Sequence, residues 1–209
     1  GGTTTDISLY TRGVPLLEPR GATIGPHRTQ IRSLFTRSQG AGGDSLVQVQ
    51  GGRIRVGPQR LGPPASLGGE HPTPTDALVL LGRALGDRAR AQRALTPVAA
   101  ALGTGVEECA RRVLQALGGE IAAGARAFVE AVNAKPVYTI HELLDGHKVR
   151  PVRVVAVGGP ARAIAPYLEE ALDLPVAVPD HFDVANAVGA ALARVNLEVN
   201  LAADTALGR

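Results

Sequence analysis

The amino-terminal segment of the chain combines residue types that bind phosphate, in the order Gly1, Gly2, Thr3, Thr4, Thr5 and Asp6. Glycines let backbone N–H groups approach an anion closely, and the three threonine hydroxyls add hydrogen-bond donors. A carboxylate such as that of Asp6 can order a magnesium ion or a water molecule beside a phosphate. A glycine pair before a strand is also an ordinary turn, so the segment by itself leaves both interpretations open.

A second glycine pair, Gly158 and Gly159, follows the apolar run 152–157 and precedes Pro160. This order predicts a strand, a tight turn and a helix, because proline suits the first turn of a helix. The backbone of such a turn can lie flat against a ligand, and the helix N-terminus points toward it. An ordinary turn between a strand and a helix explains the same pattern equally well.

Two further acidic residues are candidates for chemistry. Asp44 follows Gly42 and Gly43, and its side chain either faces the same cleft as the first glycine segment or belongs to a turn that opens a hairpin. Asp76 is either a ligand-facing acid or a charge that stabilises a helix N-terminus. We therefore take Asp6, Asp44 and Asp76 as candidate catalytic residues and Asp6 as the candidate metal ligand. We expect no metal site at the histidines, which lack the spacing of a ligand set; those considered are His71, His141, His147 and His181.

Composition and charge exclude several classes of protein. The 209 residues are 44% hydrophobic and 20% charged, which is enough apolar material for a core. The net charge of +3 comes from scattered arginines, and only 3% of residues are aromatic, so we expect no nucleic-acid partner. No apolar run is long enough to span a membrane. The single Cys109 cannot form an internal disulfide, which favours the cytoplasm.

The first third of the chain is predicted to be rich in strands. Alternating polar and apolar residues predict strands at 6–10 and 30–37, with 14–17 returning as the partner of the first. Residues 45–56 form two alternating runs joined by Gly51 and Gly52, a strong indication of a hairpin. Residues 57–75 are rich in glycine and proline and are predicted to be a loop.

Helices follow in the middle of the chain, and the last third alternates strands and helices. We predict a helix capped by Thr75, a helix over 88–102 broken near Pro97, and a long helix from Val106 to Val132 that bends at Gly118 and Gly119. The final third predicts a buried strand at 152–157, a helix after it, a short strand at 176–178 and a helix at 185–195 that is dense in small residues.

The order of these segments resembles the superfamily of actin, sugar kinases and heat-shock-70 ATPases. In that superfamily a second phosphate loop opens the carboxy-terminal lobe, and residues 1–6 look like this loop. The adenosine-binding turn looks like Gly158 and Gly159, and the second connecting helix looks like residues 185–193. Small residues in that helix let two lobes pack closely.

Within that superfamily the chain is similar to the hydantoinase/oxoprolinase family over essentially its whole length. The segments that support this similarity are 1–7, 40–45, 56–58, 72–82 and 204–206. The chain departs from the family pattern at 62–67, where Gly-Pro-Pro-Ala-Ser-Leu replaces the usual Gly-Pro-Ala-Cys-Tyr. A role for that thiol is therefore not expected, and oxoproline as the substrate is in doubt.

The resemblance implies a fold and a reaction. We expect an α/β fold in which residues 1–209 form the carboxy-terminal, ribonuclease-H-like lobe of an actin-like ATPase, with a mixed sheet, a β-rich insertion and a helical insertion. We expect ATP and magnesium as cofactors, with Gly1, Gly2, Thr3, Thr4, Thr5, Gly158 and Gly159 binding the nucleotide. The implied activity is ATP-dependent hydrolysis of cyclic amides of the hydantoin or 5-oxoproline type.

Two other functions remain open: a subunit of an ATP-dependent ketone carboxylase, and a non-catalytic ATPase of the reactivase or activase kind. The amino-terminal lobe, with its own phosphate loop, is absent from the sequence. We therefore expect this chain alone to fold but neither to hydrolyse ATP nor to bind it tightly, because about half of the nucleotide contacts are missing. A missing lobe or a partner subunit is expected to complete the site, in an oligomer.

Overall fold

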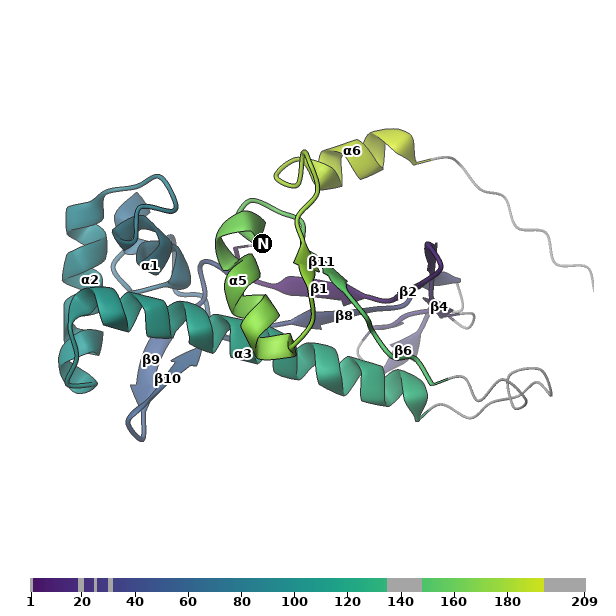
Figure 1. The fold of residues 1–209 in the computed structure, drawn as a ribbon, viewed down its shortest axis with the longest axis horizontal. Helices are drawn as coiled ribbons and strands as arrows, with labels where there is room; N and C mark the ends of the chain where they lie inside the picture. The colour runs from purple at the N-terminus through teal and green to yellow at the C-terminus, as the bar shows by residue number, and fades with distance from the viewer. Residues whose placement is uncertain (1, 19–20, 25, 30–31, 135–147, 194–209) are drawn as a thin grey trace, which may run out of the picture.

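The long helix α3 organises the molecule, and the other elements lie on its two sides along its length (Figure 1). The structure is a computed structural model, and it describes residues 2–18, 21–24, 26–29, 32–134 and 148–193. Helices α1 and α2 and the β9–β10 hairpin gather at one end of α3, while the ribbon formed by β1 and β8 runs beside it. Helix α5 packs on α3 and belongs to a small parallel β-unit.

The first forty residues form a series of short antiparallel pairs. Strand β1 pairs with β8, β2 with β3, β4 with β7, and β5 with β6. Asp6 lies opposite Ser38 in the first of these pairs. The strands are β1 (Thr5–Ser8), β2 (Tyr10–Thr11), β3 (Val14–Pro15), β4 (Leu17–Glu18), β5 (Thr23–Ile24), β6 (His27–Arg28), β7 (Ser33–Leu34) and β8 (Thr36–Gln39).

This pairing corrects the expected partner of the first strand. The sequence pattern predicted that 14–17 returns along 6–10, but only Tyr10 and Thr11 pair with β3, and all of β1 pairs with β8. Alternation reports which face of a strand is apolar and contains no information about its partner, so a non-local pairing is invisible to it. Gln30 and Ile31, the start of the predicted strand 30–37, lie outside the described residues.

The predicted hairpin is confirmed. Strands β9 (Val47–Gln50) and β10 (Arg53–Val56) pair antiparallel, and Gly51 and Gly52 between them have φ angles of 57° and 73°. Two consecutive positive φ angles define the turn whose twist matches that of a hairpin, and glycine adopts them without a steric penalty. Val47 and Val56, which face each other at the open end, are buried in the core.

The main core lies between this hairpin and three helices. These are α1 (Pro74–Leu80), α2 (Arg88–Ala101) and α3 (Val106–Asn133), and a short 3₁₀ turn, η1 (Ala65–Leu67), precedes them. Leucines at helical spacing fill the space between the helices, which is why the aromatic content can be so low. Leu80, Leu95, Leu114 and Leu117 are each at most 2% exposed.

A break was expected near Pro97, and a bend was expected at Gly118 and Gly119. Helix α2 is continuous across Pro97, and α3 is continuous across Gly118 and Gly119. Proline removes one backbone donor from a helix, but tertiary packing can outweigh that loss. On α2 the apolar neighbours of the proline, Leu95 and Val98, are buried in the core and hold the helix in place.

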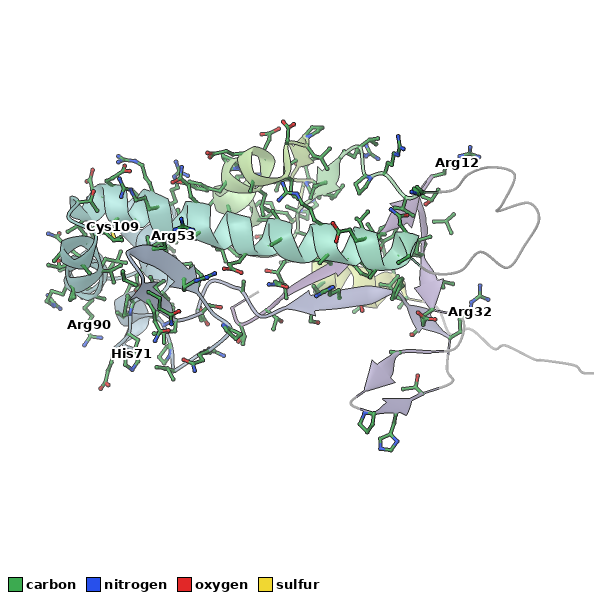
Figure 2. All side chains as sticks on the ribbon, turned by 90° about the horizontal axis from the view of Figure 1, so that it is seen from below. Arg12, Arg32, Arg53, His71, Arg90 and Cys109 are labelled. Atoms are coloured by element: carbon green, nitrogen blue, oxygen red, sulfur yellow. The ribbon has the colours of Figure 1, made fainter. Side chains whose placement is uncertain are left out.

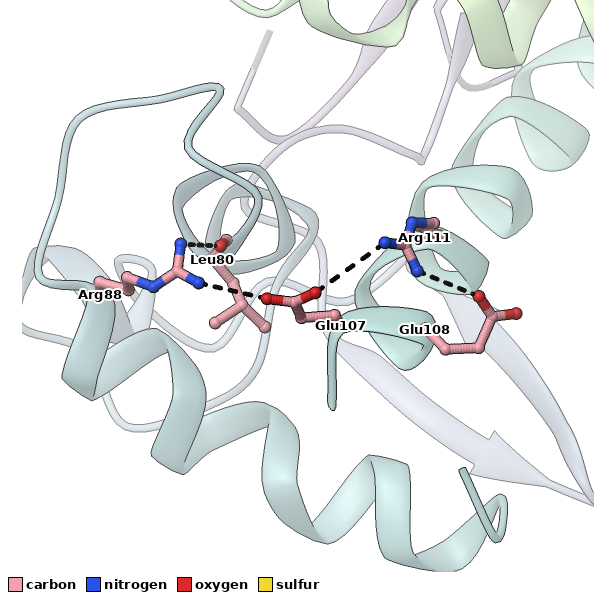
Figure 3. Close-up of polar contacts among 5 residues, drawn as sticks. All are labelled: Leu80, Arg88, Glu107, Glu108 and Arg111. Carbon is pink, nitrogen blue, oxygen red and sulfur yellow. Dashed lines mark hydrogen bonds and ion pairs between the residues drawn. The ribbon is translucent and has the colours of Figure 1, made fainter. Parts of the chain in front are cut away.

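Charged side chains join the starts of α2 and α3 at the surface (Figure 3). The guanidinium of Arg88 donates to the backbone oxygen of Leu80, at the end of α1, and lies 3.4 Å from Glu107. Arg111 bridges Glu107 at 3.9 Å and Glu108 at 3.3 Å within α3. These pairs are half exposed, so each contributes little stability, but together they fix how three helix ends meet.

The last described segment is a β-strand, a helix and a parallel β-strand. Strand β11 (Val154–Val155) pairs in parallel with β12 (Val176–Ala177), and α5 (Ala161–Leu172) connects them. Strand β11 was expected to be buried, yet its Val155 is 56% exposed, because only alternate residues here are covered. Helix α6 (Ala185–Leu192) follows and has no buried residue, so the close packing expected of it is not made within the described chain.

The fold is therefore mixed α/β, as expected, but its strands do not form the expected single mixed sheet. In the described ranges the antiparallel pairs and the β11–β12 pair are separate two-stranded sheets. Two of the strands predicted to be longer, 152–157 and 14–17, are each only two residues where they pair. Each of these short pairs supplies hydrogen-bond partners to only a few backbone groups. The other backbone groups of the chain lie in loops and helices.

Cys109 lies inside the helical end of the molecule, within the hydrophobic core. It is fully buried, and desolvation raises the pKa of its thiol, so it remains protonated and packs as a small apolar residue. In Figure 2 the labelled arginines Arg12, Arg32, Arg53 and Arg90 are spread over the length of the molecule. None of the described helices is long and apolar enough to cross a lipid bilayer.

Candidate functional site

The amino-terminal segment that was predicted to bind phosphate lies against the glycine-rich loop 40–45. The backbone oxygen of Gly2 accepts a hydrogen bond from Asp44 N–H at 2.6 Å, and Thr5 Oγ1 donates to the oxygen of Ala41 at 2.7 Å. A Cβ atom on Gly2 would lie 2.6 Å from Asp44 Oδ2. Two segments about forty residues apart in the sequence thus meet where both are rich in glycine, because side chains would separate their backbones.

The loop itself is a tight turn closed by Ser45. The Ser45 hydroxyl, which is fully buried, accepts a hydrogen bond from Gly42 N–H at 2.8 Å. The loop also anchors α1, since Thr75 N–H donates to the oxygen of Gly43 at 2.8 Å. Asp44 and Ser45 belong to a turn, which was one of the two alternatives. Asp44 also lies beside the amino-terminal segment. These hydrogen bonds hold the loop in place, and Asp44 lies where the loop faces Gly2.

Arg60 is the residue of this site that the sequence pattern did not single out. Its guanidinium lies 3.0 Å from Asp44 Oδ2 and donates to Thr3 Oγ1 at 3.3 Å. The Thr75 hydroxyl completes the surroundings of Asp44 at 3.4 Å. Arg60 was missed because it stands alone in a Gly/Pro-rich loop. The only available indication was one basic residue in the loop that follows the hairpin, sixteen positions after Asp44.

Asp6 stands on β1, on the exposed face of the ribbon. Its Oδ1 accepts a hydrogen bond of 2.5 Å from the hydroxyl of Ser38, directly opposite on β8. This bond fixes one carboxylate oxygen and leaves the residue open to solvent, where a hydrated cation can reach it. In the described residues no group of three or more His, Cys, Asp or Glu side chains is arranged to hold a metal ion.

The burial and hydrogen bonds of Asp76 differ from those of Asp6 and Asp44. It is fully buried, and its carboxylate accepts hydrogen bonds from the backbone N–H groups of Ala65 (3.2 Å), Ser66 (2.6 Å) and Thr73 (2.9 Å) and from the Thr73 hydroxyl (2.8 Å). With Thr73 it forms a capping box at the start of α1. The helix is thus capped by Thr73, two residues before the expected Thr75, because Asp76 stands three residues after Thr73 and each side chain binds the backbone N–H of the other residue.

The second glycine pair lies between β11 and α5, as predicted. Gly158 has a φ of 107°, a conformation that favours glycine, and its N–H donates to the oxygen of Phe182 at 2.6 Å. An added Cβ at Gly158 or Gly159 would meet nothing within 4 Å, so the backbone faces open space. The guanidinium of Arg162, on the first turn of α5, stacks over Phe182 at 4.7 Å from the ring centroid.

The described residues therefore place the predicted site in two parts. Gly2, Thr3 and Thr5 gather with Asp44 at one point, while Gly158 and Gly159 lie on the β11–α5 turn. No hydrogen bond or ion pair among the described residues joins the two parts. Gly1 and the segment 204–206 lie outside the described residues, as do His141 and His147.

A pocket of about 450 Å³ adjoins the first part of the site. Gly40 and Pro58 contribute to its wall, and so does Gln59, which immediately precedes Arg60. Much of the remaining wall consists of side-chain amides and one ion pair between Arg55 and Glu120 at 3.6 Å. Amide groups both donate and accept hydrogen bonds, so such a wall suits a small, neutral polar molecule.

The chain was compared with known protein families and with solved structures. The family model described as hydantoinase/oxoprolinase matches residues 1–199. A search of curated protein sequences finds no match for the chain. Among solved structures, nucleotide-free acetone carboxylase is similar with a TM-score of 0.62 at 21% identity, over 83% of this chain and 25% of that one.

A second similar structure is the ATP-dependent caprolactamase from Pseudomonas jessenii. It has a TM-score of 0.63 at 24% identity, and the similarity covers 86% of this chain and 26% of the caprolactamase chain. At these identities the two structures support the fold alone, and this chain spans about a quarter of the length of each. The family model covers nearly the whole chain, and we conclude that the chain belongs to the hydantoinase/oxoprolinase family.

Proposed function

We propose that this chain supplies one wall of the ATP site in an ATP-dependent enzyme that opens cyclic amides. The observation that supports this best is the meeting of the amino-terminal Gly-Thr segment with Asp44 and Arg60. It brings the Thr3 hydroxyl and the Arg60 guanidinium together, and both are groups that donate hydrogen bonds to phosphates. The similarity to two ATP-dependent enzymes of this fold agrees with it.

The residues present fit a magnesium–nucleotide complex. Gly2 lets the backbone come within reach of Asp44 where a Cβ would collide with its carboxylate, so the cradle is specific to glycine. Magnesium usually takes only one or two protein carboxylates and fills its other positions with water and phosphate oxygens. A single exposed carboxylate such as that of Asp6 satisfies this need without a larger acidic cluster.

Each residue then has a role that follows from its chemistry. Thr3 and Thr4 would offer hydroxyl donors to phosphate oxygens, and Asp6 would hold the magnesium ion or a water beside them. The glycine turn at 158–159 would hold the base or ribose. ATP, when bound, supplies the phosphoryl group that activates a stable amide oxygen. These side chains position and neutralise charge, which is what such chemistry needs in place of a protein nucleophile.

The amide-lined pocket beside this cluster favours a cyclic amide as the substrate. A hydantoin or lactam ring presents one N–H and at least one carbonyl oxygen, and glutamine side chains can pair with both. Carboxylation of a ketone remains the second candidate, since acetone carboxylase has the same fold at nearly the same TM-score. We expect the complete enzyme, with the lobe or subunit that completes the nucleotide site, to act as an oligomer.

The substrate class is tested by ATP turnover in the complete enzyme. We expect hydantoin, 5-oxoproline or a simple lactam to stimulate ADP release, and a ketone with bicarbonate to leave it at the background rate. The opposite pattern would assign the chain to a carboxylase. Stimulation by neither class, with steady ATP hydrolysis, would instead identify a non-catalytic ATPase of the reactivase kind.

The role of Asp6 is tested by replacing it with alanine in the complete enzyme. We expect substrate-dependent ATP turnover to fall at least about a hundredfold, because a group that stabilises charge at the reacting phosphate is lost. The replacement should leave the melting temperature nearly unchanged, since Asp6 is exposed. Glu130→Ala, which removes an exposed carboxylate from α3, is the control and should keep full turnover; full turnover in Asp6→Ala would refute the assignment.

The adenosine turn is tested by Gly159→Val. A Cβ at this position meets no atom of the protein within 4 Å, so we expect the fold to tolerate valine. The side chain would occupy the space assigned to the base or ribose, and ATP affinity should fall at least about tenfold, since the overlap must be relieved before binding. Gly119→Val, at an equally open glycine on α3, is the matched control. Unchanged ATP binding in Gly159→Val would place the nucleotide elsewhere.

A further inference from the structure

The Asp44–Arg60 ion pair lies directly at the segment assigned to phosphate. The two charged groups are 3.0 Å apart, and the same guanidinium donates to the hydroxyl of Thr3. The Asp44 side chain is 18% exposed, whereas that of Arg60 is 45% exposed. The carboxylate is therefore the fixed partner, held by Thr75 and by its own loop, while the guanidinium reaches it from the solvent side.

This geometry makes Asp44 a competitor for any anion at the same place. A guanidinium binds carboxylates and phosphates through the same planar fork of N–H donors, so a phosphate that engages Arg60 must displace or share it with Asp44. The uncompensated Asp44 carboxylate would also repel a phosphate beside Gly2 and Thr3. Both effects act in the same direction, and both disappear if the carboxylate is neutralised.

We propose that Arg60 is a phosphate-binding side chain of this site and that Asp44 restrains it, so that the ion pair sets how tightly the site binds phosphate groups. The inference rests on the proposed function, because it places the phosphates of ATP at residues 2–6. It assigns Asp44 a restraining role in place of the catalytic role predicted from the sequence. The two roles predict opposite effects for the same substitution.

The test compares Arg60→Ala, Arg60→Lys and Asp44→Asn in the complete enzyme, with inorganic phosphate and ATP as probes in calorimetric titrations with and without magnesium. We expect Arg60→Ala to weaken ATP binding about tenfold, the size of a hydrogen-bonded charge contact. Arg60→Lys keeps the charge without the fork and should recover part of that loss. Asp44→Asn should bind phosphate and ATP several-fold more tightly than the unsubstituted enzyme.

A double variant isolates the coupling between the two side chains. If Asp44 acts by restraining Arg60, the gain in ATP affinity from Asp44→Asn should be much smaller when Arg60 is already alanine. Arg53→Ala, which removes an exposed arginine from the β9–β10 hairpin, controls for the change in net charge and should leave binding unchanged. Thermal melts of every variant establish that each is folded.

The outcomes separate this inference from the proposed function. Weaker magnesium–ATP binding in Asp44→Asn would overturn it and leave Asp44 as a candidate catalytic residue. Unchanged ATP binding in Arg60→Ala, while the unsubstituted enzyme binds ATP, would overturn it and leave the proposed function standing. If the unsubstituted complete enzyme binds neither inorganic phosphate nor ATP, both are wrong.

Discussion

Replacing Asp76 with alanine is expected to lower the free energy of unfolding by about 4 kcal/mol, a large part of the stability of a domain of this size. The carboxylate is fully buried and accepts hydrogen bonds from three backbone N–H groups and one hydroxyl. Alanine would leave these donors buried without an acceptor, and each unsatisfied group costs about 1–3 kcal/mol. The link between the 3₁₀ turn η1 and helix α1 would be lost with them.

Urea unfolding of the purified protein measures this loss. Asp76→Asn should also destabilise, because its NH₂ group faces N–H donors that need an acceptor. Asp87→Ala is the matched control: this aspartate also caps a helix, accepting from Arg90 N–H at 3.0 Å, but it is exposed. We expect a clearly smaller loss there, since water can replace the carboxylate. Equal losses at the two positions would contradict the structural role of Asp76.

Replacing Gly118 with alanine is expected to destabilise the protein by about 3 kcal/mol, at the upper end of the cost of overpacking. A Cβ there would lie 2.7 Å from the backbone oxygen of Tyr167, where α3 and α5 pack together. A backbone carbonyl inside a helix cannot move aside by itself, so α5 would have to shift as a unit. The glycine turn at 158–159 precedes α5 directly and would shift with it.

The neighbouring glycine provides a control of opposite sign. Gly119 is exposed on α3, and an added Cβ would meet nothing within 4 Å. Gly119→Ala should therefore stabilise the protein by about 0.5–1 kcal/mol, because alanine loses less backbone entropy in a helix than glycine does. Thermal and urea unfolding of the two variants are the measurement. A Gly118→Ala variant as stable as Gly119→Ala would show that α3 and α5 are not in close contact there.

These two positions also bear on the proposed function. Asp76 holds the start of α1, where Thr75 contacts the loop that presents Asp44. Gly118 lets α5 lie close enough to α3 to place the second glycine turn. Loss of either contact would disturb one part of the nucleotide site without touching a ligand. Activity measured on these variants therefore reports on stability, and only exposed positions such as Asp6 report on the chemistry itself.

Local structure was predictable wherever the determining forces act within a few residues. The β9–β10 hairpin follows from alternation and two glycines with positive φ, and α3 follows from apolar residues at helical spacing. The residue types of the first segment predict phosphate binding, and this stays a prediction. The family followed from motifs spread over the whole chain, and the family model over residues 1–199 confirms it.

The errors fall where distant segments decide the outcome. Thr73 caps α1 in place of the predicted Thr75, and the Asp76 of its capping box also binds the backbone of Ala65 and Ser66, about ten residues earlier in the chain. The broken helix expected at Pro97 is continuous because core packing outweighs the local cost. Local preferences are worth at most a few kcal/mol per residue, and burial in a shared core exceeds them.

The sequence by itself determined the residue types of the candidate site, the hairpin, the long helix and the family, since each depends on local pattern or on the order of motifs. Only the tertiary structure decided which of these residues meet. It brought Asp44 to Gly2 and Thr3, added Arg60 from a loop without a recognisable pattern, and buried Asp76 among backbone donors. The physical reason is that an ion pair or a buried carboxylate depends on distance in space, and the spacing of residues along a chain does not fix that distance.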